Sequence, residues 1–125
     1  MHNFRKLKVY TIAKELVRSV YLMVDTFPMK EKYGLTDQLR RAVISIPSNI
    51  AEGLGRSTDK DKGHFMQIAY GSLMELYAQL DIAHDLGYVS KDDFAKIEVN
   101  IDGIDKMIVS LTYIRKQTSS NGNNK

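Results

Sequence analysis

The chain contains no cysteine. It therefore has no disulfide framework, no thiolate-ligated metal site and no cysteine nucleophile. A long apolar run is also missing, because residues 1–8 are polar and basic and Lys14, Glu15 and Arg18 interrupt the apolar positions that follow. This pattern excludes a signal peptide and a membrane span. We expect a soluble protein of the cytoplasm with no membrane partner.

Catalytic motifs are missing as well. No glycine-rich phosphate loop is followed by Lys-Ser or Lys-Thr, and no nucleophile elbow occurs. The run Gly53-Leu54-Gly55 is too short for a phosphate loop and ends a helix, whereas a phosphate cradle begins one. Glu52 and Glu75 are single carboxylates, which on a helix more often pair with arginine or with a helix end. We expect no catalytic residue, no cofactor and no enzymatic activity.

Two Asp-x-x-His spacings raise the question of a metal site, because such pairs bind metals in helical bundles. Asp61 with His64 and Asp81 with His84 both fall in one predicted helix, 20 residues apart. That separation corresponds to about 30 Å along the axis and roughly 200° around it. The two pairs therefore cannot share one ion, and we expect no metal.

Strands are not predicted anywhere, because no segment alternates with period two for long enough. Apolar residues instead recur at three- and four-residue intervals, which is typical of amphipathic helices. With 125 residues, 43% of them hydrophobic, the chain has room for one domain with a single core. We predict one helical domain over residues 1–117 and a disordered polar tail over residues 118–125.

Turn and capping residues divide the domain into four helices. The first is predicted over residues 9–27, ended by Pro28, and the second begins with Thr36 as its N-cap and Leu35 as a hydrophobic staple. It carries Leu39, Val43, Ile46 and Ile50 on its apolar face. We expect it to end near Gly53 and Gly55, in the left-handed conformation that favours glycine.

The third helix is predicted from residues 57–59 to Leu86, with Gly87 as its C-terminal cap. The fourth follows Ser90, which with Asp93 resembles a capping box. Its apolar face is the clearest in the chain, with Val99, Met107 and Ile114 expected to widen it, and consists of Phe94, Ile97, Ile101, Ile104, Ile108 and Leu111. The fold class is therefore all-α, an antiparallel up-down four-helix bundle.

The third helix carries two apolar stripes rather than one. The first contains Phe65, Ala69, Ser72, Leu76, Gln79 and Ala83, and the second contains Met66, Leu73, Tyr77 and Leu80. A single-chain bundle needs only about three apolar positions per heptad. We therefore expect one stripe to face the core and the other to face a partner chain.

The second helix contains an unusual stretch, Ser45-Ile46-Pro47-Ser48-Asn49. Pro47 has no amide hydrogen and clashes with the carbonyl of Val43, which costs about 3 kcal/mol in an uncompensated helix. In one interpretation the helix is kinked, Ser45, Ser48 and Asn49 supply replacement hydrogen bonds, and these polar residues pair with Glu52 or arginines. Pro47, Asn49, Glu52 and Gly53 then form a structural motif.

In the other interpretation the second helix carries a basic ridge that contacts phosphates without reading sequence. Residues 1–62 hold 12 lysines and arginines against 7 acidic residues, whereas residues 63–125 hold 6 against 8. Lysines and arginines at this density are also typical of an ordinary solvated surface. The predicted nucleic-acid-binding residues are Arg40, Arg41 and Arg56, extended by Lys60, Lys62, Arg5, Lys6 and Lys8.

Several motifs together resemble one protein family. They are Phe4-x-x-Leu7-x-Val9, Phe27-Pro28, Tyr33-Gly34-Leu35, Gln38-Leu39-Arg40-Arg41-Ala42, Ser45-Ile46-Pro47-Ser48-Asn49-Ile50-Ala51-Glu52-Gly53, Gly55-Arg56, Gly71-Ser72-Leu73-x-Glu75 and Leu86-Gly87-Tyr88. Over residues 4 to about 115 the chain resembles the four-helix-bundle proteins encoded in intervening sequences of bacterial 23S ribosomal RNA, also called S23 ribosomal proteins. It also resembles the related accessory variability determinant of diversity-generating retroelements, which binds a reverse transcriptase and nucleic acid.

The resemblance implies a cyclic homo-oligomer, a homopentamer of antiparallel bundles. Two departures imply weaker nucleic-acid binding: Tyr70 stands where relatives often carry arginine, and Ser57 stands where many carry a second basic residue. We expect a non-enzymatic oligomer that binds RNA or DNA through the second helix. The alternative is a protein-interaction scaffold in which Asn49, Glu52 and Arg56 build subunit contacts.

Overall fold

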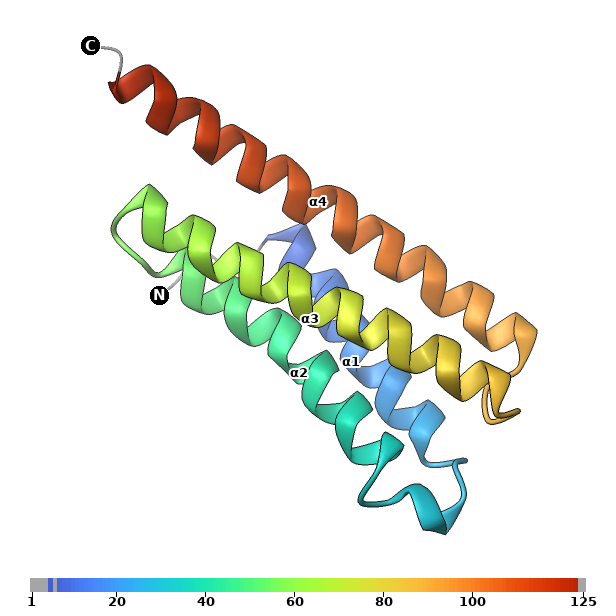
Figure 1. Cartoon of the computed structure of the whole chain (residues 1–125). Helices are drawn as coiled ribbons and strands as arrows, with labels where there is room; N and C mark the ends of the chain where they lie inside the picture. The colour runs from blue at the N-terminus through green and yellow to red at the C-terminus, as the bar shows by residue number, and fades with distance from the viewer. Residues whose placement is uncertain (1–4, 6, 124–125) are drawn as a thin grey trace.

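The structure is a computed structural model that describes the backbone of residue 5 and residues 7–123, and the side chains of these residues as far as residue 112. Within this part the chain forms the helices α1 (Lys8–Val24), α2 (Leu35–Leu54), α3 (Asp59–Asp85) and α4 (Lys91–Asn123), with a short 3₁₀ helix, η2 (Met29–Glu31), before α2 (Figure 1). No strand occurs in the described residues. The prediction of an all-α fold with four helices is confirmed.

The four helices lie side by side, and each pair of consecutive helices is joined at an end of the molecule (Figure 1). Helix α1 packs against α2 and α4, and α3 also packs against α2 and α4, whereas the backbones of the diagonal pairs stay further apart in the part of the chain that the structure describes. Each helix therefore has two neighbours and one inner face. None of the helices in the described part is both long and apolar enough to cross a membrane.

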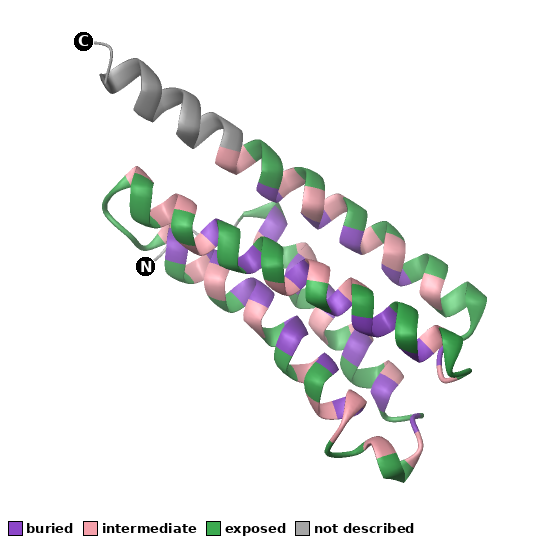
Figure 2. Ribbon diagram, in the orientation of Figure 1, coloured by how far each residue is buried: buried purple, intermediate pink, exposed green. Residues whose placement is uncertain are grey.

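A single core fills the space between the helices, and Figure 2 shows the buried residues on their inner sides. The largest fully buried side chains are Leu16, Val20, Leu39, Ile46, Ile50, Met66, Leu73, Leu76, Leu80, Ile101, Ile104 and Ile108. On α3, Leu76 and Ala83 from one predicted stripe and Leu73 and Leu80 from the other are all buried in this core. The two stripes are thus neighbouring parts of one inner face, and they need no second chain to cover them.

The ends of α2 differ from our prediction. Thr36 is not the N-cap, because the helix already begins at Leu35 and Thr36 is buried in its first turn. A carboxylate from the preceding segment serves this end instead: the amide of Leu35 donates to Glu31 Oε1 at 3.4 Å. At the other end Gly55 has a φ of −86°, so neither it nor Gly53 adopts the left-handed conformation.

The turns around α3 follow the predicted residues. Thr58 Oγ1 accepts a hydrogen bond from the Asp61 amide at 3.1 Å, and Ser90 Oγ accepts one from the Asp93 amide at 3.1 Å. Gly87 has a φ of +82°, which is the left-handed conformation that ends α3. These local capping patterns therefore carried over directly from sequence to structure.

The first and last helices differ in length from our expectation. Helix α1 ends at Val24, three residues before the predicted end, and Phe27 turns inward to lie 5.3 Å from the Tyr88 ring. Helix α4 continues to Asn123, so residues 118–123, predicted as part of the tail, have a helical backbone. An existing helix adds residues at little cost, which accounts for this extension. Val99 is 70% exposed and does not widen the core face; the side chain of Ile114 lies outside the described residues.

Gly87 provides a test of the α3–α4 turn. A Gly87→Ala substitution places an L side chain at φ +82° and should lower the free energy of unfolding by about 1 kcal/mol. Urea denaturation measures the change. The matched control is Gly103→Ala within α4, where a Cβ meets no atom within 4 Å and should raise stability by about 0.5–1 kcal/mol. Equal effects of the two substitutions would contradict this account.

Candidate functional site

Pro47 lies inside α2, buried, and the polar residues around it form a hydrogen-bonded network. Asn49 Nδ2 donates to the carbonyl of Ser45 at 2.8 Å and to its hydroxyl at 2.9 Å. The Ser45 hydroxyl in turn lies 2.8 Å from the hydroxyl of Ser72 on α3. The network therefore joins α2 to α3, and it does not replace the hydrogen bond that Pro47 denies to Val43, which corrects one part of our structural interpretation.

Gly53 marks a place where α2 and α3 approach closely. A Cβ built on Gly53 would lie 2.9 Å from Phe65 Cβ and 3.2 Å from the carbonyl oxygen of Lys62. One helical turn further, the Arg56 guanidinium lies 4.7 Å from the centre of the Phe65 ring and 2.5 Å from Glu52 Oε1. Glu52, Gly53 and Arg56 therefore fasten the end of α2 to the start of α3 within one chain.

The arginines at the other end of α2 point in different directions. Arg40 lies over the Tyr21 ring of α1 at 5.4 Å and 3.6 Å from Asp25, with 36% of its side chain exposed. Arg41 is 79% exposed and pairs with Asp37 on its own helix at 3.1 Å. Adjacent helical residues point about 100° apart, so the two arginines cannot share a stripe. Arg40 is largely a packing residue, whereas Arg41 is available to a ligand.

The remaining predicted basic residues gather at one end of the molecule. The N-terminal part of α1 lies beside the C-terminal part of α2, because Tyr10 and Ala51 line the same groove, and the end of α2 lies against Lys62 at the start of α3. Lys6 lies outside the described residues. The other members of this group, which we call the basic end, are Arg5, Lys8, Arg56, Lys60 and Lys62.

The predicted basic ridge is thus two separate sites. Arg40 and Arg56 are about 24 Å apart along α2, and only the basic end combines residues from three segments of the chain. Arg5, Lys8 and Lys60 are exposed, and Lys62 is half-buried. Glu52, Asp59 and Asp61 lie in the same region, so the excess of positive charge at this end is small.

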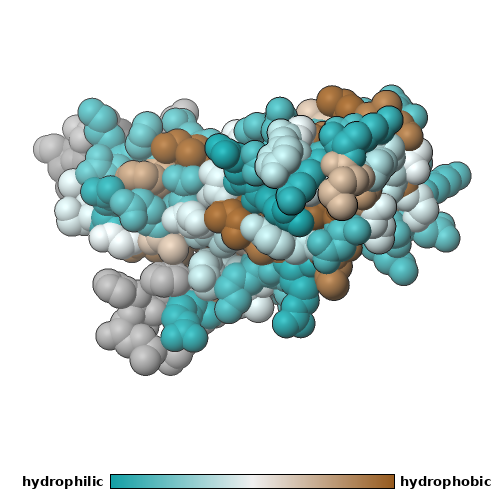
Figure 3. Space-filling view, turned by 90° about the horizontal axis from the view of Figure 1, so that it is seen from below, coloured by the Kyte–Doolittle hydropathy of each residue, from teal (hydrophilic) through white to brown (hydrophobic). Residues whose placement is uncertain are grey.

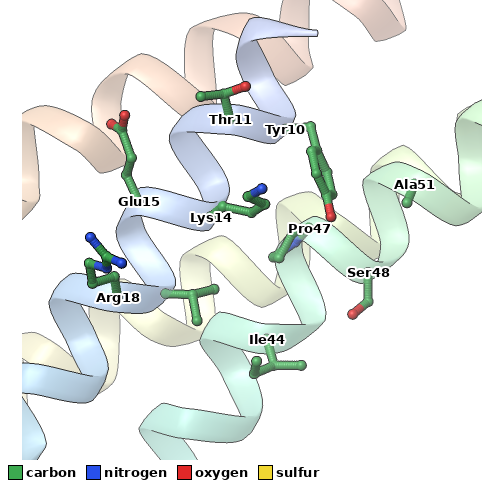
Figure 4. A pocket seen from close by; sticks show the side chains of 10 residues that line it. Tyr10, Thr11, Lys14, Glu15, Arg18, Ile44, Pro47, Ser48 and Ala51 are labelled. Carbon is green, nitrogen blue, oxygen red and sulfur yellow. The ribbon is translucent and has the colours of Figure 1, made fainter. Parts of the chain in front are cut away.

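A groove of about 710 Å³ runs between α1 and α2 (Figure 4). In Figure 4, Lys14 and Tyr10 reach from α1 toward α2, while Thr11 and Glu15 point away from it. Lys14 Nζ lies 5.5 Å from the centre of the Tyr10 ring. The other lining residues are Val17, Arg18, Ile44, Pro47, Ser48 and Ala51. No pattern in the sequence predicted this groove.

One of the two histidines in the Asp-x-x-His spacings has a hydrogen-bond partner within the chain. His84 Nδ1 lies 2.8 Å from the carbonyl of Val89, so this nitrogen carries the proton and donates it, and the ring packs 5.3 Å from Phe94. Asp61 takes part in the α3 cap through its amide. No group of three potential metal ligands occurs among the residues that the structure describes.

Tyr77 has a raised pKa. The Tyr77 hydroxyl on α3 donates a short hydrogen bond to Glu98 on α4. This hydrogen bond, with a smaller contribution from burial and from the negative charges of Glu98, Asp102 and Asp81, raises the pKa of Tyr77 to about 12. The proton belongs to an α3–α4 contact, so we assign Tyr77 a structural role.

A family of known proteins shares this chain's pattern from residue 5 to residue 110, described as the 23S rRNA-intervening sequence protein family. The chain belongs to this family. The resemblance to the proteins of 23S rRNA intervening sequences is confirmed. Among solved structures, a protein of unknown function from the S23 ribosomal protein family of Bacteroides thetaiotaomicron is similar, with a TM-score of 0.75 and 19% identity over 83% of this chain and 97% of that chain. At this identity the likeness shows the fold alone. No curated protein matches the chain.

Gly53 offers a test of the α2–α3 contact. Gly53→Ala should lower the free energy of unfolding by about 1–3 kcal/mol, because its Cβ would push α2 away from α3. Gly55→Ala is the matched control, since a Cβ there makes only ordinary contacts at 3.6 Å. Urea denaturation followed by circular dichroism measures both. A Gly53→Ala protein as stable as the control would show that the helices are further apart than described.

The Tyr77–Glu98 contact predicts a pH dependence. The phenol ionises near pH 10.0 in the unfolded chain and near pH 12 in the folded one, so its stabilising effect is complete below pH 10 and disappears as the pH rises to 12. Ultraviolet titration of tyrosinate should show one late step, absent in Tyr77→Phe. Tyr33→Phe, which removes an 86% exposed phenol, should leave that step in place. A late step that persists in Tyr77→Phe would refute the assignment.

Proposed function

We propose that this chain is a cytoplasmic, non-enzymatic protein that binds RNA or DNA through the basic end, as a homo-oligomer of antiparallel up-down bundles. The observation that supports nucleic-acid binding is the convergence of Arg5, Lys8, Arg56, Lys60 and Lys62 from three segments. Cations that converge on one surface contact phosphates of one backbone and release their counterions. Such contacts position a protein without reading base sequence.

In this proposal the predicted nucleic-acid-binding residues contribute unequally to phosphate attraction. Lys8 and Lys60 carry exposed cations, so they contribute most to phosphate attraction in this proposal. Arg56 contributes less, because it is paired with Glu52 and packed on Phe65. Arg40 contributes least, since Tyr21 and Asp25 hold it against α1. Arg41 adds a separate exposed cation near the opposite end of α2.

Neutralising the basic end tests the proposal. The triple substitution Lys8→Gln, Lys60→Gln and Lys62→Gln should weaken binding to a structured ribosomal RNA fragment, measured by fluorescence anisotropy at low and physiological salt. Each lost phosphate contact lowers the salt slope by about 1, so the triple variant should lose about 2–3 in slope. An unrelated duplex serves as the second ligand and separates preference for the fragment from general polyanion attraction.

The matched control neutralises three lysines of α4, namely Lys91→Gln, Lys96→Gln and Lys106→Gln, which removes the same charge elsewhere. The proposal requires this control to bind more tightly than the basic-end variant. An equal loss of binding in both variants would show that net charge alone, and not the position of the lysines, determines the affinity. No binding by the unmodified protein at low salt would refute nucleic-acid binding altogether.

A protein-interaction scaffold is the second candidate function, and exposed apolar side chains favour it. Ile82, Leu86 and Val109 are each at least half exposed. The subunit contacts that we predicted through Asn49, Glu52 and Arg56 are less favoured, because these side chains bond within their own chain. Light scattering on the Arg40, Arg41 and Arg56 triple variant separates the roles, since a changed molar mass would assign these arginines to assembly.

A further inference from the structure

Helix α3 has a row of residues that remain exposed within the part of the chain that the structure describes. Its members recur at intervals of three and four, which is the spacing of a coiled-coil contact, and all are exposed. They are Ile68, Gly71, Glu75, Ala78 and Ile82, and we call them the α3 seam. Ile68 is 38% exposed and Ile82 51% exposed. The seam lies outside both apolar stripes predicted for this helix.

The seam alternates large and small side chains. A Cβ built on Gly71 would meet no atom within 4 Å, so nothing within this chain requires a glycine there. Glycine is also a weak helix former, and its place in the middle of a helix is unfavourable. Small residues at a helix surface allow a second helix to approach closely, because the distance between packed helices depends on the side chains at the contact.

The α1–α2 groove has the complementary shape and chemistry. Its α2 side consists of the apolar residues Ile44, Pro47 and Ala51 together with Ser48, and Lys14 reaches over it from α1 (Figure 4). The lining residues Tyr10 to Arg18 span about 12 Å of helix α1. Ile82 and Glu75 are seven residues apart, about 10.5 Å along α3. The spacing of Ile82 and Glu75 in the seam therefore matches the length of the groove.

Charge favours the same pairing. Helix α1 carries three cationic residues against one carboxylate, whereas α3 carries two cationic residues against five carboxylates. Glu75, in the middle of the seam, is exposed and hydrogen-bonded only to Gln79 of its own helix among the described residues. On the side of the molecule seen in Figure 3, hydrophobic residues form separate patches among hydrophilic ones.

We propose that the α3 seam of one copy docks in the α1–α2 groove of a second copy, with an isoleucine on the Ile44–Pro47–Ala51 surface and Glu75 beside Lys14 and Arg18. This inference rests on the homo-oligomer proposed above and names its interface. The two surfaces are different patches of the same molecule. The contact is therefore heterologous, and repeating it produces a closed ring or an open filament rather than a two-fold dimer.

Gly71→Leu tests the seam without disturbing the single chain. A Cβ at this position meets no atom of its own chain within 4 Å and leucine improves helix propensity, so circular dichroism should show an intact fold that is at least as stable. The same side chain blocks close approach of a second helix. Light scattering should show a shift from a multiple of 14.2 kDa toward 14.2 kDa. Gly103→Leu, equally open on α4, is the control and should leave the molar mass unchanged.

A charge exchange tests the pairing itself. Glu75→Lys places like charges together and should dissociate the oligomer, and Lys14→Glu with Arg18→Glu should do the same. Combining all three substitutions in one chain restores opposite charges and should restore the molar mass. Lys106→Glu on α4 is the control for a simple change of net charge, and should assemble as the unmodified protein does.

The outcomes distinguish a failure of this interface from a failure of the proposed homo-oligomer on which it rests. An unmodified protein of 14.2 kDa at high concentration overturns the homo-oligomer and the interface together, and leaves the seam to a different protein. An oligomer that survives Gly71→Leu and Glu75→Lys keeps the homo-oligomer and overturns this interface. An oligomer that Gly71→Leu dissociates and the combined charge exchange restores supports both.

Discussion

The close approach of α2 and α3 is the constraint on which the other features of this molecule depend. Gly53 has no Cβ to separate the helices, and the short side chains of Ser45 and Ser72 share a hydrogen bond at 2.8 Å further along. Gln79 continues the contact by donating to Gln38 at 3.3 Å. Because polar and small residues occupy this boundary, the two helices are held in one register as well as in contact. That register brings Arg56 over Phe65 and gathers the basic end.

The unusual stretch around Pro47 gains its meaning from this arrangement. Ser45 and Asn49 lie on the side of α2 that faces α3, whereas Pro47 and Ser48 lie on the side that faces α1. One stretch of sequence therefore builds a polar network on one side and the wall of a groove on the other. Neither use depends on a ligand. The residues that propensity disfavours are explained by the two neighbours of α2, each of which approaches a different side of the helix.

Patterns among neighbouring residues predicted the four helices and the caps around α3. Features that depend on contacts between distant parts of the chain could not be predicted in this way. The periodicity of Leu39, Ile46 and Ile50, with the caps at Thr58 and Ser90, is readable along the chain because each signal depends on neighbours a few residues away. The start of α2 was missed because Glu31 reaches it from outside the helix. The single basic ridge that we predicted is two separate sites in the structure, because arginines that are adjacent in sequence point in different directions from the helix. The hydrophobic periodicity of the sequence did not indicate the α3 seam, because three of its five positions are Gly71, Glu75 and Ala78, which are small or charged.

The two proposals strengthen one another through valency. One copy offers few exposed cations at its basic end, and Glu52, Asp59 and Asp61 offset part of them, so a single copy attracts phosphates weakly. In a closed ring every copy is related by the same rotation, so all basic ends lie on one side. A nucleic acid that bridges two of them binds the second at a high effective concentration, which raises the affinity without any new contact. The departures at Ser57 and Tyr70 lower the phosphate attraction expected of each copy, so under the two proposals assembly determines whether nucleic acid is bound at physiological salt.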